Sequence, residues 1–411
     1  MADYKAKGGE RTTAPSSDEQ IASTNALVLD GPSALALYRD RDDLKAGLQQ
    51  RDKPSEPVVR FDEDAEDFWL SDEDLAMTLS GESIFSDFSK SKDDAYLESD
   101  GETLPPLVRS SMTRMRKAAA RSRDLKQVPY ETLGIRPPAH SSPLYLLVPQ
   151  VGRRRSVKHV SQRLCRTTLP ERSFLRLGNK VYVPTPELTF LLMAHYLELH
   201  QLIVLGMELC GFYRLVGAAT QSPLVSNRTL YGRAPLTTPH RIAAFLDRAS
   251  GVTGLPLAKR ALSYLEAGSA SPMETALYLL LCLPRKLGGY GLPHPQLNAR
   301  RQVTPRAGSF TLSKSLVPDL LWPDARLDLE YDSEEFHASE DALQRGARRA
   351  LALRAMGVEV VSVTKEVVYD KAAFDTLARM VAKAIGARVR KLTESGECER
   401  QLLRQTTLFA E

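Results

Sequence analysis

Residues 317–337 read VPDLLWPDARLDLEYDSEEFH, and positions 327–332 within this stretch alternate strictly between apolar and acidic side chains. Because successive strand side chains point to opposite faces, the alternation predicts a strand with one apolar and one acidic face. Same-face neighbours lie roughly 7 Å apart, so stacked carboxylates repel one another unless the face is fully solvated or binds a cation. The two faces consist of Leu327, Leu329 and Tyr331, and of Asp328, Glu330 and Asp332.

The bulk composition indicates a globular protein. The chain has 411 residues, 43% of them hydrophobic, which is enough for two or three domains. No apolar run reaches the length of about 18 residues that a membrane-spanning helix requires, so no membrane association is expected. The N-terminal stretch lacks the apolar core of a secretory signal, and the four cysteines are scattered without a C-x-x-C pair. A cytoplasmic location is therefore expected.

The net charge of +4 conceals two oppositely charged regions. Residues 1–102 contain 25 acidic and 11 basic residues, whereas the rest of the chain contains 26 acidic and 44 basic residues. A basic body with an acidic arm is typical of proteins that handle nucleic acid, so DNA is the expected partner. Residues 1–105 are expected to form a mostly disordered acidic arm. This arm is either a plain surface tail or a segment that docks on the basic body and competes with DNA.

The middle of the chain is expected to consist of a basic segment followed by a folded domain. Residues 106–139 are expected to be a basic linker or helix, and residues 140–268 a middle domain that begins as α+β and continues as helices. A proline opens each helical pattern, as expected for a first helical turn. The patterns predict strands at 143–150 and 180–190, a long helix from Pro186, and helices at 239–250 and 256–267.

Residues 269–390 are expected to form an α/β domain, followed by a C-terminal tail at 391–411. The elements follow one another as helix, three strands, helix, strand, helix. A helix that joins two strands of one sheet is a crossover, so a mixed sheet with helices on its faces is expected. The predicted segments are 271–284, 296–303, 315–321, 325–332, 340–356, 357–364 and 372–389.

Two carboxylates in this region are placed to hold a metal ion. Asp319 ends the second predicted strand and Glu330 lies midway along the third, so the hairpin brings both to one rim of the sheet. Hard oxygen ligands suit Mg²⁺, with Mn²⁺ as a substitute. Such an ion would neutralise the acidic face and polarise a phosphodiester. Asp332 and His337 lie beside it, and a histidine can carry a proton to or from the reacting oxygens.

The linked pattern resembles a known nuclease superfamily. A PD pair, ten intervening residues, E-x-D and a histidine five residues further on resemble the PD-(D/E)XK nucleases. More narrowly, EYDSEEFH followed by RRALALRAMGVEVVSVT is similar to Vsr-like endonuclease domains over about residues 270–390. The resemblance implies an αβββαβα core and metal-dependent cleavage of DNA.

The resemblance also implies roles for individual residues. Asp319 and Glu330 match the metal-binding acids, and His337 matches the catalytic histidine. Asp332 stands where many relatives have lysine, and Glu274 corresponds to a helical acid that completes many such sites. Three arginines of the predicted crossover helix fit phosphate contacts, namely Arg345, Arg348 and Arg349.

Several of these residues have a structural alternative. Glu274 is also the last residue of an S-x-x-E capping box that begins at Ser271, in which case it only secures its own helix. Asp328 has no counterpart in the resemblance and is expected to be a solvated strand residue. The crossover helix departs from the relatives because Gly346 stands where they often have an acid, a change that weakens metal placement if second-shell contacts are lost.

The middle region is also similar to a known family. PLYLLVPQVGRRRSVKHVSQRL at 143–164 and FLRLGNKVYVPTPELTFLLMAHYL at 174–197 are similar to the C-terminal part of AbiEi-type antitoxins, which often precede such nuclease domains. The winged-helix DNA-binding module of those relatives is not evident before it.

Two functions remain open at this point. The first is a metal-dependent DNA endonuclease that acts in repair, defence or a mobile-element context. The alternative is a non-catalytic DNA-binding regulator of antitoxin type that retains a nuclease fold, with a toxin or defence-system protein as partner. In a further variant of the first function, the acidic arm mimics DNA and keeps the nuclease closed.

Overall fold

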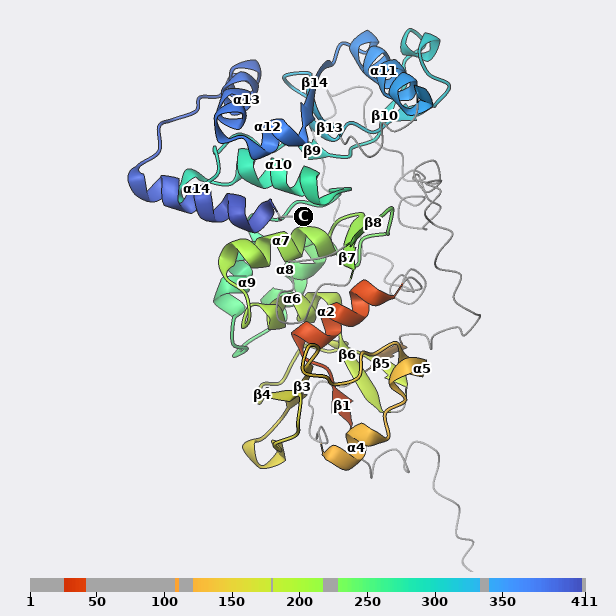
Figure 1. The fold of residues 1–411 in the computed structure, drawn as a ribbon, viewed down its shortest axis with the longest axis vertical. Helices are drawn as coiled ribbons and strands as arrows, with labels where there is room; N and C mark the ends of the chain where they lie inside the picture. Colours follow the sequence, from red (N-terminus) through yellow and green to blue (C-terminus); the bar gives the residue numbers. More distant parts are fainter. Residues whose placement is uncertain are drawn as a thin grey trace, which may run out of the picture.

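The structure is a computed structural model of the chain. It describes residues 26–41, 108–110, 121–178, 180–216, 228–332 and 340–408. Within these ranges the protein is a mixed α/β molecule whose several small sheets are separated by helices (Figure 1). No helix in the same ranges is long and apolar enough to cross a bilayer.

The lower part of the molecule in Figure 1 is built on a four-stranded sheet and a separate pair of parallel strands. The sheet has the order β1-β6-β5-β2, in which β1 is parallel to β6 and the other neighbours are antiparallel. Strands β3 and β6 lie where alternating patterns predicted strands. The bounds are Leu27–Val28 for β1, Val108–Ser110 for β2, Leu144–Val148 for β3, Val160–Leu164 for β4, Phe174–Gly178 for β5 and Val181–Pro184 for β6.

The expectation of a disordered arm is wrong for residues 26–41. They form β1 and helix α2 (Gly31–Asp40), which begins after the capping side chain of Asp30. The ring of Tyr38 is fully buried, and its hydroxyl donates a 2.6 Å hydrogen bond to the carbonyl of Pro184. The segment is therefore part of the core, because its apolar side chains face α6. The remainder of the predicted arm lies outside the described residues.

The predicted basic linker at 106–139 also contributes to the fold. Residues 108–110 pair with β5 as strand β2. Two short helices follow, α4 (Ser122–Lys126) and α5 (Tyr130–Leu133). This region is thus an edge strand followed by two short helices. The helices belong to the fold because the side chains of Leu125 and Leu133 are buried in the core.

A helical layer lies above this sheet in Figure 1. The single long helix predicted from Pro186 is two helices, because a capping box between Glu198 and Gln201 starts a second helix. The chain after this second helix forms a small antiparallel hairpin, β7–β8. The bounds are Pro186–Met193 for α6, Leu199–Leu209 for α7, Tyr213–Val216 for β7, Arg228–Tyr231 for β8, Pro239–Arg248 for α8 and Leu255–Leu262 for α9.

The upper part of the molecule contains the sheet that carries the candidate site. Its order is β14-β13-β12-β9, antiparallel except for the parallel pair β13–β14 that helix α11 connects. The mixed sheet with a helical crossover is therefore as predicted. The bounds are Pro272–Cys282 for α10, Gln296–Leu297 for β9, Leu320–Trp322 for β12, Leu327–Asp332 for β13, Glu340–Ala355 for α11, Glu359–Thr364 for β14, Lys365–Tyr369 for α12 and Lys371–Ala384 for α13.

The strands predicted at 296–303 and 315–321 are each divided, the first into β9 and β10 and the second into β11 and the start of β12. Residues 296–303 were expected to form one strand, but only β9 joins the sheet, while β10 (Arg301–Gln302) pairs with β11 (Ser315–Leu316) in a separate hairpin. The chain turns between β9 and β10 at Asn298, which has a positive φ. The hairpin is seated by Ala307, which is fully buried in a small cluster that includes side chains of α11.

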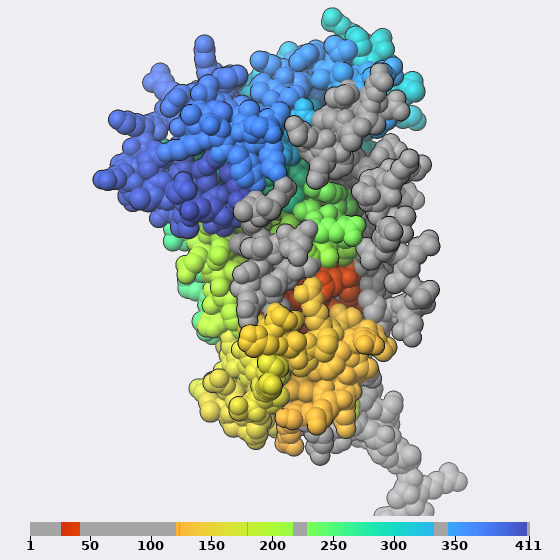
Figure 2. Space-filling view, in the orientation of Figure 1, coloured from red at the N-terminus to blue at the C-terminus, as the bar shows by residue number. Residues whose placement is uncertain are grey.

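The predicted C-terminal tail is instead a packed helix, α14 (Glu394–Thr407). It lies against α10 and α7. The guanidinium of Arg400 lies 3.7 Å from the ring centre of Tyr290, and Leu403 is fully buried. One hydrophobic cluster runs from Leu27 to Leu403, so the upper part rests directly on the lower part, as the space-filling view also shows (Figure 2).

Candidate functional site

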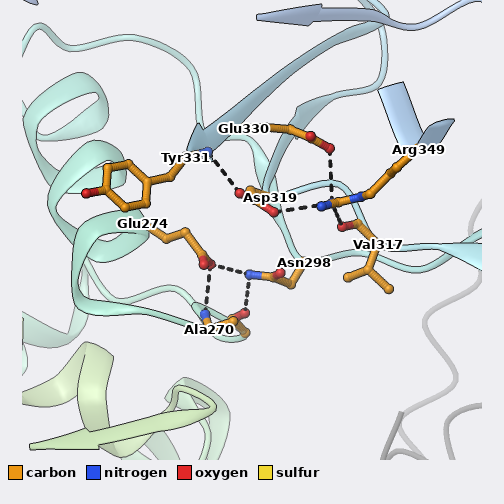
Figure 3. Close-up of polar contacts among 9 residues, drawn as sticks. Ala270, Glu274, Asn298, Val317, Asp319, Glu330, Tyr331 and Arg349 are labelled. Atoms are coloured by element: carbon orange, nitrogen blue, oxygen red, sulfur yellow. Dashed lines mark hydrogen bonds and ion pairs between the residues drawn. The ribbon is translucent and has the colours of Figure 1, made fainter. Parts of the chain in front are cut away.

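The acidic face of β13 and the residue before β12 form one polar cluster beneath α11 (Figure 3). Strand pairing sets Leu320 opposite Leu329, and continuing this register by one residue places Asp319 opposite Glu330. The same nitrogen of Arg349, Nη2, lies 3.3 Å from Oδ1 of Asp319 and 3.0 Å from Oε1 of Glu330. The two carboxylates predicted to bind magnesium are therefore brought together, and both contact the guanidinium of Arg349.

Backbone groups fix the position of this cluster. The second carboxylate oxygen of Asp319 accepts a 3.0 Å hydrogen bond from the backbone N–H of Tyr331. Arg349 also donates to the backbone carbonyl of Val317. Asp319 is thus anchored to β13 by one oxygen and directed at Arg349 by the other, because β13 supplies the first donor and α11 supplies the second.

Asp328 is not the solvated strand residue that was expected. Its side chain is 0% exposed, and neither carboxylate oxygen has a hydrogen-bond partner among the described residues. Burial, together with the charges of Glu330 and Asp319, raises the pKa of Asp328 to about 9. The metal-free protein therefore holds this carboxyl in its neutral form at pH 7.

The neighbouring groups respond to the same burial and charges. Burial raises the pKa of Glu330, with Arg349 opposing this shift and Asp319 adding to it. Burial acts to lower the pKa of Arg349, but the carboxylates of Asp319, Glu330 and Asp328 outweigh it and raise the pKa above its ordinary value. The guanidinium is consequently charged at any pH the protein encounters.

Glu274 lies close to this cluster, but its carboxylate is occupied by local hydrogen bonds. It accepts 2.8 Å and 2.5 Å hydrogen bonds from the backbone N–H of Ala270 and the side-chain amide of Asn298. The hydroxyl of Ser271 caps the same helix by accepting from the backbone N–H of Glu274. The Ser271 bond is one half of the expected capping box, whereas the Glu274 carboxylate accepts from Ala270 and not from the backbone N–H of Ser271. Burial, with the nearby charge of Asp319, raises the pKa of Glu274 to about 8, so the two groups interact electrostatically.

The remaining predicted site residues are placed differently. Asp332 ends β13, is half-buried, and adds its charge to the environment of Glu330. His337 lies outside the described residues. Arg345 and Arg348 lie on α11 with exposed side chains, whereas Arg349 is half-buried and directed at the acid pair. The structure thus separates Arg349 from the two arginines with which the sequence grouped it.

The donor set fits a magnesium ion in kind. Magnesium takes one or two carboxylates and completes its shell with water or phosphate oxygens, and Asp319 and Glu330 already converge on one positively charged atom. The unpartnered, buried carboxyl of Asp328 adds an oxygen donor nearby. Within the described residues, however, no group of three or more acidic, histidine or cysteine side chains is arranged to hold a metal. The position between Asp319 and Glu330 is taken by the guanidinium of Arg349.

Sequence reasoning missed Asn298 and the inward role of Arg349. Asn298 has a positive φ of 47°, which asparagine tolerates better than most residues, and this lets its amide reach Glu274. Nothing local in the sequence marks that contact. The spacing of Arg349 from Arg345 by four residues places both on one helix face, but it does not reveal which arginine faces the sheet.

No protein-family model, no curated protein and no solved structure matches this chain.

Proposed function

We propose that this protein is a metal-dependent endonuclease that hydrolyses phosphodiester bonds in DNA, with a PD-(D/E)XK-type core of the Vsr-like kind. The observation that carries the proposal is the convergence of Asp319 and Glu330 on a single cationic atom. Two carboxylates that converge at one rim of a hairpin supply the oxygen ligands that a magnesium-dependent phosphodiesterase uses. The basic balance of the chain beyond the first 102 residues supports DNA as the substrate.

In this proposal the residues of the chain have distinct tasks. Asp319 and Glu330 hold the ion, and the backbone N–H of Tyr331 keeps Asp319 in position. A bound magnesium ion supplies Lewis-acid stabilisation of the charge that develops on the phosphate. Arg345 and Arg348 bind neighbouring phosphates through their exposed guanidinium groups. Asp332 and His337 remain predicted to guide a proton at the reacting oxygens.

A plasmid-nicking assay tests this function directly. We expect the full chain to nick supercoiled DNA with Mg²⁺ or Mn²⁺, and Asp319→Asn and Glu330→Gln each to lower the rate at least about 100-fold because they weaken the ion's hold. The matched control is Asp324→Asn, which alters an exposed carboxylate in the turn of the same hairpin and should leave the rate unchanged. Equal metal-dependent rates for all three variants and the wild type would remove the proposal.

The same geometry gives one specific reason to retain a second candidate, a non-catalytic DNA-binding regulator of antitoxin type. Arg349 already offsets one of the two negative charges of the acid pair, so the pair has a counter-charge without an ion. A partner toxin or defence-system protein belongs to this alternative. DNA binding without cleavage, unaffected by Asp319→Asn, would favour it.

A further inference from the structure

The contacts of Arg349 set it apart from the other arginines of α11. Its Nη2 atom touches Asp319 and Glu330 at 3.3 and 3.0 Å and donates to the carbonyl of Val317. Figure 3 shows the side chain reaching from α11 across the rim of the hairpin to these oxygens. We propose that Arg349 is an internal counter-ion that competes with the divalent ion for the acid pair, and that a bound ion releases it to contact the phosphate of the substrate. The inference rests on the proposed function.

Arg349 and a divalent ion would compete because both would contact the same carboxylate oxygen of Asp319. Oδ2 of Asp319 accepts from the backbone N–H of Tyr331, which leaves Oδ1 for a cation, and Arg349 contacts that same atom. An ion held between Asp319 and Glu330 needs this oxygen. Two cations a few ångströms apart in a partly buried site repel each other strongly, so the guanidinium and the ion exclude each other.

An Arg349 side chain displaced from the acid pair can turn to solvent and reach a bound phosphate. Its side chain is 29% exposed, so solvent already reaches it. Arg345 precedes it by four residues and therefore lies on the same face of α11, with its own side chain exposed. A guanidinium fork that leaves one carboxylate pair matches a phosphate equally well, because both present paired oxygens to it. Binding of the ion should thus create an additional phosphate contact.

The first measurement is Mn²⁺ affinity of the full chain without nucleic acid, read from the electron paramagnetic resonance signal of free Mn²⁺. If Arg349 competes, Arg349→Met binds Mn²⁺ about 10-fold more tightly than the wild type, and Arg349→Lys falls between them. Arg354→Met, which removes another exposed arginine of the same helix, is the matched control and should show wild-type affinity. Equal or weaker affinity in both Arg349 variants overturns the inference, since an arginine that only positions the acids would weaken binding when lost.

The second measurement is the coupling between ion and phosphate. A short DNA duplex is titrated onto the wild type with and without Ca²⁺, which occupies oxygen sites. We expect Ca²⁺ to tighten DNA binding in the wild type, and the ratio of the affinities with and without Ca²⁺ to fall about 10-fold in Arg349→Lys. The absence of any Ca²⁺ effect in the wild type, or an equal effect in the variant, contradicts release of Arg349.

These outcomes separate the inference from the function on which it rests. If Asp319→Asn abolishes Mn²⁺ binding but both Arg349 variants bind as the wild type does, the metal site stands and the inference is wrong. If Asp319→Asn does not alter Mn²⁺ binding in the Arg349→Met background either, the acid pair holds no ion. In that case the proposed function fails as well.

Discussion

Asp328 shows how strongly a single position on an alternating strand depends on what covers it. Its neighbours on the same face, Glu330 and Asp332, are half-buried, whereas Asp328 has no exposed surface. A buried carboxyl without a hydrogen-bond partner is costly when ionised, so it keeps its proton. The acidic face of β13 therefore carries less negative charge at pH 7 than its sequence implies.

This raised pKa predicts a pH dependence of stability for the metal-free protein. Between about pH 4, where an unfolded aspartate titrates, and about pH 9, the folded state binds the proton of Asp328 more tightly than the unfolded state does. Its contribution is thus fully present below pH 4 and is lost as the pH rises. Asp328→Asn should raise the unfolding free energy by on the order of 2 kcal/mol at pH 8 and have little effect at pH 5.

Urea unfolding in the presence of EDTA at the two pH values measures this difference. The exposed Asp324→Asn serves as the control, because its carboxylate lies in the turn of the same hairpin. An equal effect of Asp328→Asn at pH 5 and pH 8 would show that the carboxyl is not held neutral.

At the scale of elements, α14 is joined to the upper part by an unusually close approach. Gly288 has a φ of +85°, and a Cβ built on it would lie 2.5 Å from the carbonyl oxygen of Glu399 in α14. Arg400 completes the contact, since its Nε donates a 2.9 Å hydrogen bond to the carbonyl of Gly288. A helix that was expected to be a tail is therefore held by backbone contact, charge and burial together.

Gly288→Ala should consequently cost about 3 kcal/mol of unfolding free energy, because it combines left-handed backbone strain with a clash against α14. Gly386→Ala isolates the first of these terms, because Gly386 also has a positive φ, +69°, but nothing lies within 4 Å of its added Cβ. We expect it to cost about 1 kcal/mol. Thermal unfolding of the two variants checks the difference, and equal losses would mean that α14 is not seated on Gly288.

At the scale of the whole molecule, the N-terminal segment ties distant parts of the chain together. Asp30 is fully buried and accepts hydrogen bonds from Nε of Arg163 at 2.7 Å and from the hydroxyl of Tyr196 at 2.5 Å. These partners lie more than a hundred residues further along the sequence. Through Asp30, the N-terminal segment therefore links β4 to the chain that follows α6.

Asp30→Asn should lower the unfolding free energy by about 3 kcal/mol, because it leaves the partly buried guanidinium of Arg163 without its counter-charge. Asp40 offers a matched comparison, since its ion pair with Arg136 is much more exposed. Asp40→Asn should cost less than about 1 kcal/mol. Denaturant unfolding compares the two, and similar losses would argue against a structural role for residues 26–41.

The sequence by itself determined the features that follow from local periodicity. The alternation at 327–332 predicted β13 and its two faces, proline-led patterns predicted α8 and α9, and the order of elements predicted a mixed sheet with a crossover. Because the geometry of a strand or helix repeats every few residues, such patterns are visible in the chain. The spacing of Asp319 and Glu330 across a hairpin belongs to the same class.

Tertiary structure alone decided the contacts between residues far apart in the chain. It directed Arg349 at the acid pair, covered Asp328, and placed residues 26–41 and α14 in the core. No local pattern encodes these outcomes, because the burial and charge of a side chain depend on which distant surface packs against it. The acidic face was readable from the sequence, but the guanidinium that pairs with it could be identified only in the folded protein.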